Sequence, residues 1–301
     1  NGDNQDDICL VLYYAVGSKD VCVWTDSTSQ PWLFRQTINS QSIPRLSGIG
    51  DVNNDGFDDT LLHIPNNPTG ETNNRLVLYY GSPTFPVTDS LVICEDSNSI
   101  IKTWACPLGD VNGDSYDDFT AGSLIYDYSQ HLWLGSDSLS AAWSLDLSAY
   151  DPPPPSYISE RGTGYPMVHG DLNGDGYQDV LGFHSEAGYY SGYLYLWMGS
   201  PNMNGSLDYV TLGMAGYDCR NYGWSKVTGD FNADGFCDVA VGAPWWGPHN
   251  EHNETGRVYI LAGNANLHET TVANDDPLLL PPPQLSIRVF PNPLRREEIV
   301  Q

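Results

Sequence analysis

Basic residues are scarce in this sequence. Lysine and arginine together number 12 in 301 residues, against 38 aspartates and glutamates, and the formal net charge is −26. Proteins that bind nucleic acids neutralise phosphates with clustered basic side chains. The balance therefore excludes nucleic acid as a partner. Nearly half of the acidic residues lie within five short, similar segments of the chain.

Long apolar runs are also lacking. A membrane-spanning helix needs roughly 18 to 20 consecutive apolar residues, whereas the longest runs here, such as CLVLYYAV from Cys9, have the length of a strand. We therefore predict no transmembrane segment. No secretory leader is recognisable, and the chain begins inside one of the repeated acidic segments. We expect the natural protein to start upstream, with its targeting segment there.

Cysteine is sparse and has no metal-binding spacing. The six cysteines include no C-x-x-C pair, which argues against a zinc ribbon or a thioredoxin-like site. Three pairings are compatible with the order of the predicted strands: Cys9 with Cys22, Cys94 with Cys106, and Cys219 with Cys237. Thiols are the alternative, because six cysteines allow 15 pairings and the sequence does not choose among them.

The common catalytic motifs are missing as well. The sequence has no G-x-S-x-G elbow, no Walker loop and no H-E-x-x-H motif. The segment HNEHNE, His249–Glu254, carries two histidines and two glutamates, but we interpret it as a polar surface loop rather than a transition-metal site. Catalysis is therefore the minor interpretation.

What the chain does contain is a repeated nine-residue pattern. It reads DVNNDGFDD from Asp51, DVNGDSYDD from Asp110, DLNGDGYQD from Asp171 and DFNADGFCD from Asp230. The chain opens inside a fifth copy, NGDNQDD, which ends at Asp7. The final aspartates, Asp7, Asp59, Asp118, Asp179 and Asp238, follow one another at steps of 52, 59, 61 and 59 residues. The sequence is therefore an array of similar units.

The pattern suits a hard cation. Side-chain oxygens fall at positions 1, 3, 5 and 9 and a backbone carbonyl at position 7, and several oxygen ligands in a flexible geometry favour Ca²⁺ over Mg²⁺. The chain must curl tightly, so position 6 needs a residue that accepts positive φ. Gly56, Gly176 and Gly235 meet this need, Asn4 tolerates it, and Ser115 does not. Five repetitions disfavour the alternative, a polar turn without an ion.

We predict one Ca²⁺ in each complete copy, bound most weakly in the copy with Ser115. The amino-terminal copy lacks position 1 and should also bind weakly. The predicted ligands are Asp51, Asn53, Asp55, Phe57 and Asp59; Asp110, Asn112, Asp114, Tyr116 and Asp118; Asp171, Asn173, Asp175, Tyr177 and Asp179; Asp230, Asn232, Asp234, Phe236 and Asp238; and, at the amino terminus, Asn1, Asp3, Gln5 and Asp7.

Strands, not helices, follow the pattern. An apolar or small-residue stretch begins at each final aspartate, for example DVAVGAP from Asp238, and an aromatic-rich stretch such as GRVYILAGN follows. A weaker third strand and a short strand that enters the next copy bring the number to four per unit. A repeat of this length with four strands predicts a propeller blade. We expect an all-β fold, a β-propeller of four-stranded blades with five repeats visible, truncated at its amino terminus.

The last unit supports a family. The stretch YGWSKVTGDFNADGFCDVAVGAP, with Tyr222, Gly223 and the Gly242–Pro244 triplet, resembles the FG-GAP repeat of integrin α-chain propellers and their bacterial relatives. The resemblance covers roughly residues 1–265, although the earlier units keep the metal loop and lose the YG and GAP residues. It implies that each metal loop joins the first two strands of a blade on one face of the ring, and that Ca²⁺ supports the blade.

The carboxyl-terminal region differs in composition. We assign residues 1–274 to the blades and residues 275–284, DDPLLLPPPQ, to a proline-rich linker. Residues 285–301 begin LSIRVFPNP, which is similar to the start of the C-terminal sorting domains of some Gram-negative surface proteins. The alternative is a closing strand that pairs with the first blade.

The main functional hypothesis is a non-catalytic, calcium-stabilised binding or adhesion module. Loops of modest affinity do not fill at cytosolic calcium levels, so we place the protein outside the cell or on its surface, in a bacterium. The ligand, a glycan or a protein, is predicted to contact the face opposite the metal loops through Trp245, Trp246, Asn250, Asn253, Glu254, Glu186, Tyr189 and Tyr190. The alternatives are an accessory or catalytic propeller of a secreted polysaccharide-degrading enzyme and a structural spacer.

Overall fold

The computed structural model describes residues 8–13, 18–24, 32–39, 44–64, 74–83, 89–96, 105–122, 130–147, 167–184, 193–212, 223, 225–243, 257–267 and 286–291. These residues form strands and turns, and they contain no helix that could span a membrane. The prediction of an all-β chain is thus confirmed for the part of the chain that is described. The chain divides into two compact units, Asn1–Leu147 and Ser148–Gln301.

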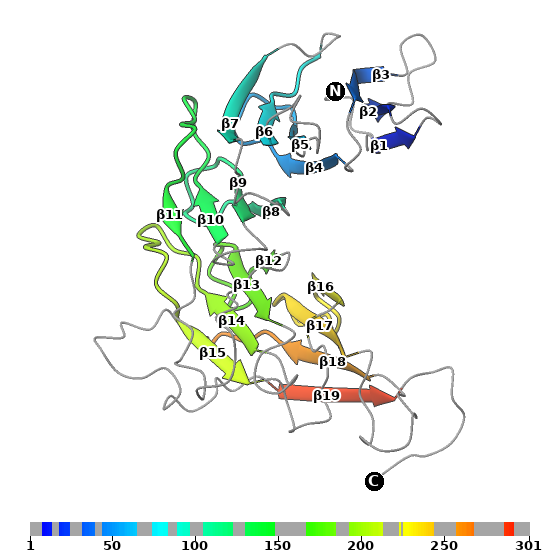
Figure 1. Ribbon diagram of the computed structural model, residues 1–301. Helices are drawn as coiled ribbons and strands as arrows, with labels where there is room; N and C mark the ends of the chain where they lie inside the picture. The colour runs from blue at the N-terminus through cyan, green and yellow to red at the C-terminus, as the bar shows by residue number, and fades with distance from the viewer. Residues whose placement is uncertain are drawn as a thin grey trace, which may run out of the picture. The chain divides into compact units, whose positions relative to one another are not determined.

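The first unit contains three antiparallel sheets (Figure 1). Sheet order is β1-β2-β3 in the first, β4-β5-β6-β7 in the second and β11-β10-β9-β8 in the third. The strands are β1 (Ile8–Tyr13), β2 (Ser18–Trp24), β3 (Trp32–Asn39), β4 (Arg45–Gly50), β5 (Asp59–Ile64), β6 (Asn74–Tyr79), β7 (Ser90–Asp96), β8 (Ala105–Gly109), β9 (Asp118–Gly122), β10 (Gln130–Trp133) and β11 (Leu145–Asp146).

The second unit contains two four-stranded antiparallel sheets, β12-β13-β14-β15 and β16-β17-β18-β19. Their strands are β12 (Val168–Gly170), β13 (Asp179–His184), β14 (Tyr193–Trp197), β15 (Tyr209–Leu212), β16 (Ser225–Gly229), β17 (Asp238–Ala243), β18 (Arg257–Ala262) and β19 (Ser286–Pro291). Four-stranded antiparallel sheets repeated along a chain are the building blocks of a β-propeller, and the architecture is consistent with the predicted fold.

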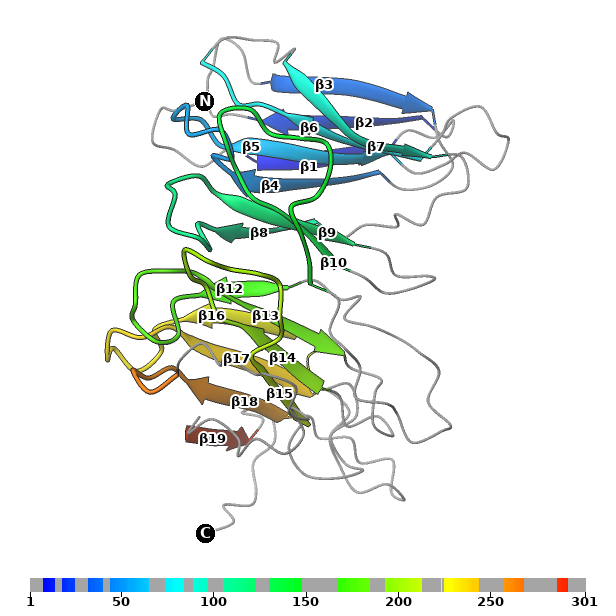
Figure 2. The same ribbon diagram turned by 90° about the vertical axis from the view of Figure 1, so that its left-hand side faces the viewer.

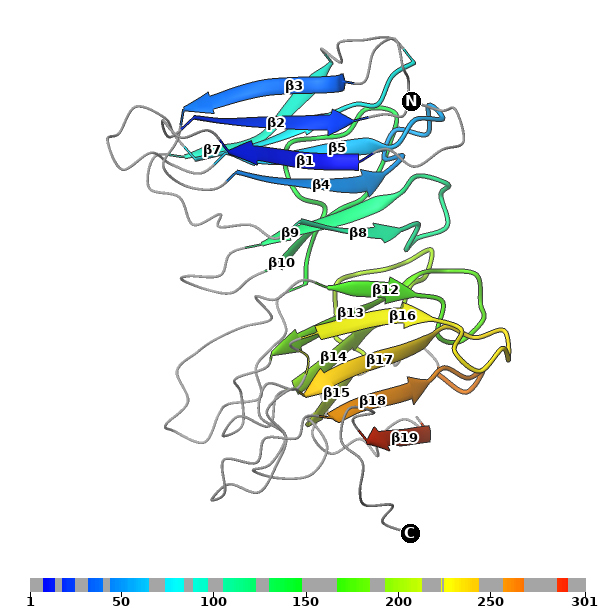
Figure 3. The same cartoon turned by 90° about the vertical axis from the view of Figure 1, so that its right-hand side faces the viewer.

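Within each unit the sheets stack through their first strands. In the first unit β4 lies between β1 and β8 (Figure 3), and in the second β12 lies beside β16 (Figure 2). Apolar side chains fill the space between stacked sheets. One core includes Ile49, Leu78 and Phe119, and the other includes Leu181, Phe183 and Tyr259. Every residue of β9 is buried, and β9 lies inside its sheet, between β8 and β10.

The carboxyl-terminal strand β19 pairs with β18, a partner that the sequence did not indicate. β19 runs antiparallel to β18, with Val289 opposite Tyr259, and supplies the fourth strand of the last sheet. The closing-strand alternative placed this segment on the first blade, and the observed pairing differs from it. The domain limits at residues 274, 284 and 285 and the resemblance to a sorting domain stay predictions.

The predicted disulfides are wrong for the cysteines that the structure describes. Cys22, Cys94, Cys106 and Cys237 are thiols and not members of a disulfide, and each of the three predicted pairings includes at least one of them. The strand register gives the reason: Leu10, not Cys9, lies opposite Cys22. Cys94 lies opposite Leu76, whereas Cys106 lies opposite Thr120 in the next sheet. The thiol alternative therefore holds for these four residues.

Candidate metal centre

Four nine-residue loops occupy equivalent places in their sheets. The loops join β4 to β5, β8 to β9, β12 to β13 and β16 to β17, and the strand that follows begins at position 9 each time, at Asp59, Asp118, Asp179 and Asp238. Within each unit the loops project from the same end of the stacked sheets (Figure 2). The family resemblance predicted this connection between the first two strands of each sheet, and the structure confirms it for these four sheets.

The carboxylate at position 1 holds each loop in a curl. Asp51 Oδ1 accepts a hydrogen bond from the Asp55 backbone N–H at 3.0 Å, and Asp51 Oδ2 accepts one from Gly56 at 2.7 Å. The side chain at position 5 then accepts the N–H of position 7, as Asp55 does from Phe57 at 3.0 Å. The same bonds recur in the other three loops.

The curl requires two left-handed residues, of which the sequence predicted one. At position 6, Gly56, Ser115, Gly176 and Gly235 have φ of 91°, 73°, 92° and 92°. This confirms the conformation inferred for that position. At position 4, Asn54, Gly113, Gly174 and Ala233 also have positive φ, between 54° and 78°. Of the four loops, only the one from Asp171 has glycine at both places. In the loop from Asp230, position 4 is Ala233, and its positive φ adds strain that the sequence pattern did not reveal.

The aspartate at position 9 is buried and holds the loop to its sheet. Asp59 is fully buried, and its Oδ2 accepts the N–H of Val52 at 3.0 Å while its Oδ1 accepts that of Gly81 at 2.7 Å. Equivalent pairs of bonds reach Asp118, Asp179 and Asp238. This carboxylate therefore joins the start of the loop to the end of the third strand.

Negative charge accumulates around that carboxylate. Burial raises the pKa of Asp59 to about 7 against the two backbone hydrogen bonds that lower it, and the charges of Asp55 and Asp51 raise the pKa further. The same causes raise the pKa of Asp118 and Asp179 to about 7. Three carboxylates thus repel one another inside each of these loops, and a bound cation would relieve the repulsion.

Sequence reasoning missed a glycine that each loop depends on. Gly81, Gly135, Gly199 and Gly263 donate their N–H to the buried aspartate. A Cβ at Gly135 would lie 2.5 Å from the Asp117 carbonyl oxygen, and one at Gly263 would lie 2.3 Å from that of Cys237. Only glycine fits so close to backbone. Its signal was visible as the repeated Gly-Ser or Gly-Asn that ends YYGS, WLGS, WMGS and LAGN.

Neighbouring loops within a unit are joined directly. The N–H of position 8 donates to the carbonyl of position 1 in the preceding loop, from Asp117 to Asp51 at 3.1 Å and from Cys237 to Asp171 at 2.9 Å. Ser136 and Asn264 likewise donate to the position 2 carbonyls of Val52 and Leu172. The Asp117 side chain adds a bond, because its Oδ2 accepts the N–H of Asp51 at 2.9 Å. We call this arrangement the loop junction.

The donor set fits a hard divalent cation. Each complete loop presents three carboxylates, an amide side chain and a carbonyl, all oxygen ligands of the kind Ca²⁺ prefers. In the described residues, however, no three His, Cys, Asp or Glu side chains are gathered closely enough to hold a metal ion by themselves. The asparagine at position 3 and the carbonyl at position 7 would have to complete the ligand set.

Some predicted site residues lie outside the described part of the chain. These are the amino-terminal ligands Asn1, Asp3, Gln5 and Asp7, the segment His249–Glu254, and the proposed ligand contacts Trp245, Trp246, Asn250, Asn253, Glu254, Glu186, Tyr189 and Tyr190.

Comparison with known families agrees with this geometry. Residues 222–261 match the FG-GAP repeat. The matched segment contains the fourth loop, β17 and nearly all of β18. The other three loops share the backbone conformation of that loop, so the FG-GAP-like arrangement is repeated along the chain. The resemblance drawn from the YG and GAP residues is confirmed by this match.

Three curated relatives cover larger parts of the chain. Human integrin alpha-6 is 32% identical over 108 residues, which is 34% of this chain and 9% of the relative. Chicken integrin alpha-V is 27% identical over 148 residues, 48% of this chain and 14% of the relative. Bovine phosphatidylinositol-glycan-specific phospholipase D is 30% identical over 168 residues, 50% of this chain and 19% of the relative. The chain therefore spans less than a fifth of the length of these relatives.

Proposed function

We propose that this chain is a calcium-stabilised, extracellular β-propeller module that binds a protein or a glycan. The observation that carries the calcium proposal is the fourfold repetition of one loop geometry, in which a buried aspartate and two further carboxylates share a tight curl. The similarity to integrin α-chains supports a role in binding or adhesion.

Calcium would stabilise the fold rather than take part in a reaction. The ligands proposed for each ion are the side chains at positions 1, 3, 5 and 9 and the carbonyl at position 7. Burial raises the pKa of Asp59, Asp118 and Asp179, and the neighbouring carboxylates raise it further; an ion there would favour the charged form of all of them. Because cytosolic free calcium is too low for loops of modest affinity, we place the module in a calcium-rich extracellular setting, secreted or attached to a cell surface.

Calorimetric titration of the calcium-free protein tests this part of the proposal. We expect about one ion per complete loop, and a melting temperature that falls when a chelator is added. Asp114→Ala, at position 5 of the second loop, should remove one binding event, whereas Asp137→Ala, an exposed aspartate outside every loop, should remove none. No heat of calcium binding together with a melting temperature unchanged by chelator would refute the calcium proposal.

The ligand is proposed to meet the face opposite the metal loops. β13 and β17 each begin at a loop and run away from it, and the predicted contacts Glu186, Tyr189, Tyr190 and Trp245–Glu254 follow the far ends of these two strands in the sequence. Aromatic rings beside amide and carboxylate groups suit a sugar or a protein surface. A glycan array and a panel of extracellular matrix proteins, both with calcium present, would identify the ligand.

Substitution of the two tryptophans tests this face. Trp245→Ala combined with Trp246→Ala should abolish binding and leave the melting temperature within a few degrees of the parent. Unchanged binding with a large loss of stability would show instead that the two rings are core residues.

An enzymatic role is the second candidate, and the similarity to a phospholipase D is the observation that favours it. The matched segment is 19% of that relative, so the similarity applies to a repeat region and not to a whole enzyme. In this alternative the chain is an accessory or catalytic module of a secreted enzyme that degrades polysaccharide. Release of reducing sugar from a polysaccharide panel would favour the alternative over pure binding.

A further inference from the structure

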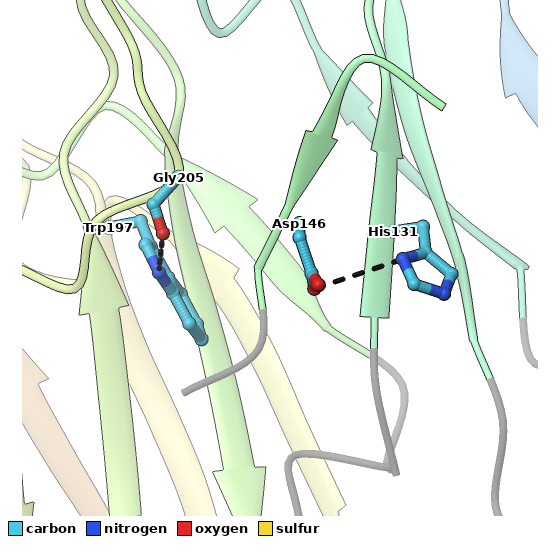
Figure 4. A network of polar contacts seen from close by, with 4 residues as sticks. All are labelled: His131, Asp146, Trp197 and Gly205. Atoms are coloured by element: carbon cyan, nitrogen blue, oxygen red, sulfur yellow. Dashed lines mark hydrogen bonds and ion pairs between the residues drawn. The ribbon is translucent and has the colours of Figure 1, made fainter. Parts of the chain in front are cut away.

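An exposed aromatic cluster lies beside the third sheet of the first unit. Trp143 is 52% exposed, and its ring stacks on His131 with centroids 4.1 Å apart and planes inclined by 17°. Trp133 lies edge-on to both rings at 6.4 Å. Asp146, whose side chain is 54% exposed, has its carboxylate 3.8 Å from His131 Nδ1 (Figure 4). We call Trp143, His131 and Asp146 the Trp143 platform.

The hairpin beneath the platform is held firmly. Trp133 is buried, and its Nε1–H donates to the Ala141 carbonyl at 3.2 Å. Ser144 N–H donates to Leu132 at 2.8 Å, and Ser144 Oγ accepts the N–H of Leu134 at 3.1 Å. These bonds fix the backbone on both sides of Trp143. The exposed ring is therefore preorganised, which lowers the entropy lost on binding.

The hairpin of β14 and β15 is closed by the same hydrogen bonds but carries different side chains. Trp197 Nε1–H donates to the carbonyl of Gly205, eight residues later (Figure 4). Trp133 makes the same bond to Ala141, also eight residues later. Asp208 N–H donates to Leu196, and Asp208 Oδ2 accepts the N–H of Met198, which repeats the bonds of Ser144. By this correspondence the places of His131, Trp143 and Asp146 are taken by Tyr195, Leu207 and Val210.

The two hairpins share the hydrogen bonds that hold the backbone but differ at the three residues of the Trp143 platform. The hairpin closes equally well with leucine and valine at two of the three places, so the fold does not require a tryptophan at 143 or an aspartate at 146. The structurally matched tryptophans Trp133 and Trp197 are both buried, whereas Trp143 is not. Here the Trp143 ring stays exposed, stacked on a histidine that lies 3.8 Å from a carboxylate. Something other than hairpin stability accounts for this pair of side chains.

The charges around the platform favour a cationic ligand. The face of an indole attracts cations, and the histidine that stacks on this indole has the Asp146 carboxylate 3.8 Å from its Nδ1. Residues 130–147 contain two aspartates and no lysine or arginine, in a chain with a net charge of −26. Arginine suits the site better than lysine, because the flat guanidinium group stacks on an aromatic ring while its N–H groups bind a carboxylate in pairs. A neutral sugar would stack on the ring but gain nothing from the charge.

We propose that the Trp143 platform binds an arginine side chain on a basic segment of a partner protein. Trp143 supplies the stacking face, Asp146 accepts hydrogen bonds from the guanidinium group, and His131 supports the ring from behind. This proposal goes beyond the glycan or protein ligand of the opposite face and is independent of it.

The test uses the whole chain, saturated with calcium, and a short peptide of alternating arginine and serine. At about 0.15 M salt the Debye length is roughly 8 Å, which suppresses long-range attraction to the acidic surface. Binding is followed through the indole Nε1–H resonance of Trp143, assigned by its disappearance in Trp143→Leu. That variant copies Leu207 of the second hairpin, so it should fold, and its melting temperature is measured alongside.

We expect Trp143→Leu to weaken peptide binding about three- to tenfold and Asp146→Asn to weaken it about two- to fivefold. Asp137→Asn removes the same charge from an exposed place in the same hairpin and should change the affinity less than about twofold. A peptide with lysine in place of arginine should bind more weakly.

Three results would overturn the proposal. Equal effects of Asp137→Asn and Asp146→Asn would mean that the peptide senses bulk charge. Unchanged affinity in a folded Trp143→Leu variant would mean that the ring is not the contact. Saturation of the Trp143 resonance by a neutral glucose oligosaccharide, with no response to the arginine peptide, would identify the platform as a sugar site.

Discussion

The backbone of each metal loop passes twice through the left-handed region, and the residues at those two places set the local strain. Ser115, with φ of 73°, stands at position 6, where the other three loops have glycine, and Ala233, with φ of 60°, stands at position 4, where two of the other three loops have glycine. A Cβ at the matching residues Gly56, Gly176 and Gly235 would meet nothing within 4 Å. At Ser115 the cost therefore arises from the backbone conformation and not from a clash.

Replacing these residues with glycine should stabilise the protein. A left-handed residue with a Cβ costs roughly 1–2 kcal/mol, and the added freedom of glycine in the unfolded chain returns part of this. We expect Ser115→Gly and Ala233→Gly each to raise the free energy of unfolding by about 0.5–1 kcal/mol, measured by urea denaturation.

Ala142→Gly is the matched control, because Ala142 is exposed and does not have positive φ. This change should lower the free energy of unfolding by a few tenths of a kcal/mol or more. A loss of stability in Ser115→Gly of the same size would contradict the assignment of strain. In calcium titrations, Ser115→Gly should also strengthen binding to the loop from Asp110, which we predict to be the weakest of the four.

Each sheet depends on the close approach of its third strand to the metal loop. Gly135 follows β10 and lies against the loop backbone, so that its N–H reaches Asp118 Oδ1 at 2.8 Å. The next residue, Ser136, donates to the Val52 carbonyl at 2.9 Å. Gly135 and Ser136 together therefore connect the end of the third strand to two successive loops.

Gly135→Ala should destabilise the protein strongly. Its Cβ would meet the Asp117 carbonyl oxygen at 2.5 Å, Tyr116 Cβ at 2.6 Å and the Val52 carbonyl oxygen at 2.8 Å. Backbone cannot yield as a flexible side chain does, so we expect a loss of about 1–3 kcal/mol in the free energy of unfolding. Gly48→Ala, where a Cβ meets nothing within 4 Å, should be neutral or slightly stabilising. Similar losses in both variants would show that the contacts at Gly135 are not the cause.

Within each compact unit, the loop junction connects neighbouring nine-residue loops by hydrogen bonds. The Asp51 backbone both donates to the Asp117 carboxylate and accepts from the Asp117 N–H. Because Asp51 is also a proposed ligand at position 1, its orientation depends on the following loop. Burial raises the pKa of Asp117 despite the hydrogen bond from Asp51, which is a sign of how closely the junction is packed. An ion in one loop should therefore favour the conformation that binds an ion in the next.

Asp117→Ala should weaken this coupling. The change leaves the Asp51 N–H without its acceptor, which we expect to cost about 1–3 kcal/mol in the free energy of unfolding. Calcium affinity should fall at the loop from Asp51 as well as at the mutated loop. Asp58→Ala is the control, since Asp58 holds the same position 8 in its own loop but is exposed. An equal loss of affinity in both variants would indicate a simple charge effect in place of the junction.

Features that depend on neighbouring residues can be predicted from the sequence alone. The metal loops are contiguous, so their curl, the positive φ at position 6 and the strand that starts at position 9 follow from nine residues each. The alternation of loops and strands at nearly constant steps then indicated four-stranded units, and residues such as Gly223 and Gly242 indicated the FG-GAP repeat before any comparison.

Contacts between residues far apart in the sequence are visible only in the folded structure. The partner of each buried aspartate, such as Gly81 for Asp59, lies 22 residues away in the first described loop and 17 in the second, so no fixed spacing announces it. The pairing of β19 with β18 and the side chain that fills the loop junction, Asp117 in one unit and Cys237 in the other, depend on long-range contacts. The exposure of each tryptophan also depends on packing. Trp197 is buried, whereas Trp143 is exposed. His131 and Trp133 pack against the Trp143 ring and fill the space beneath it.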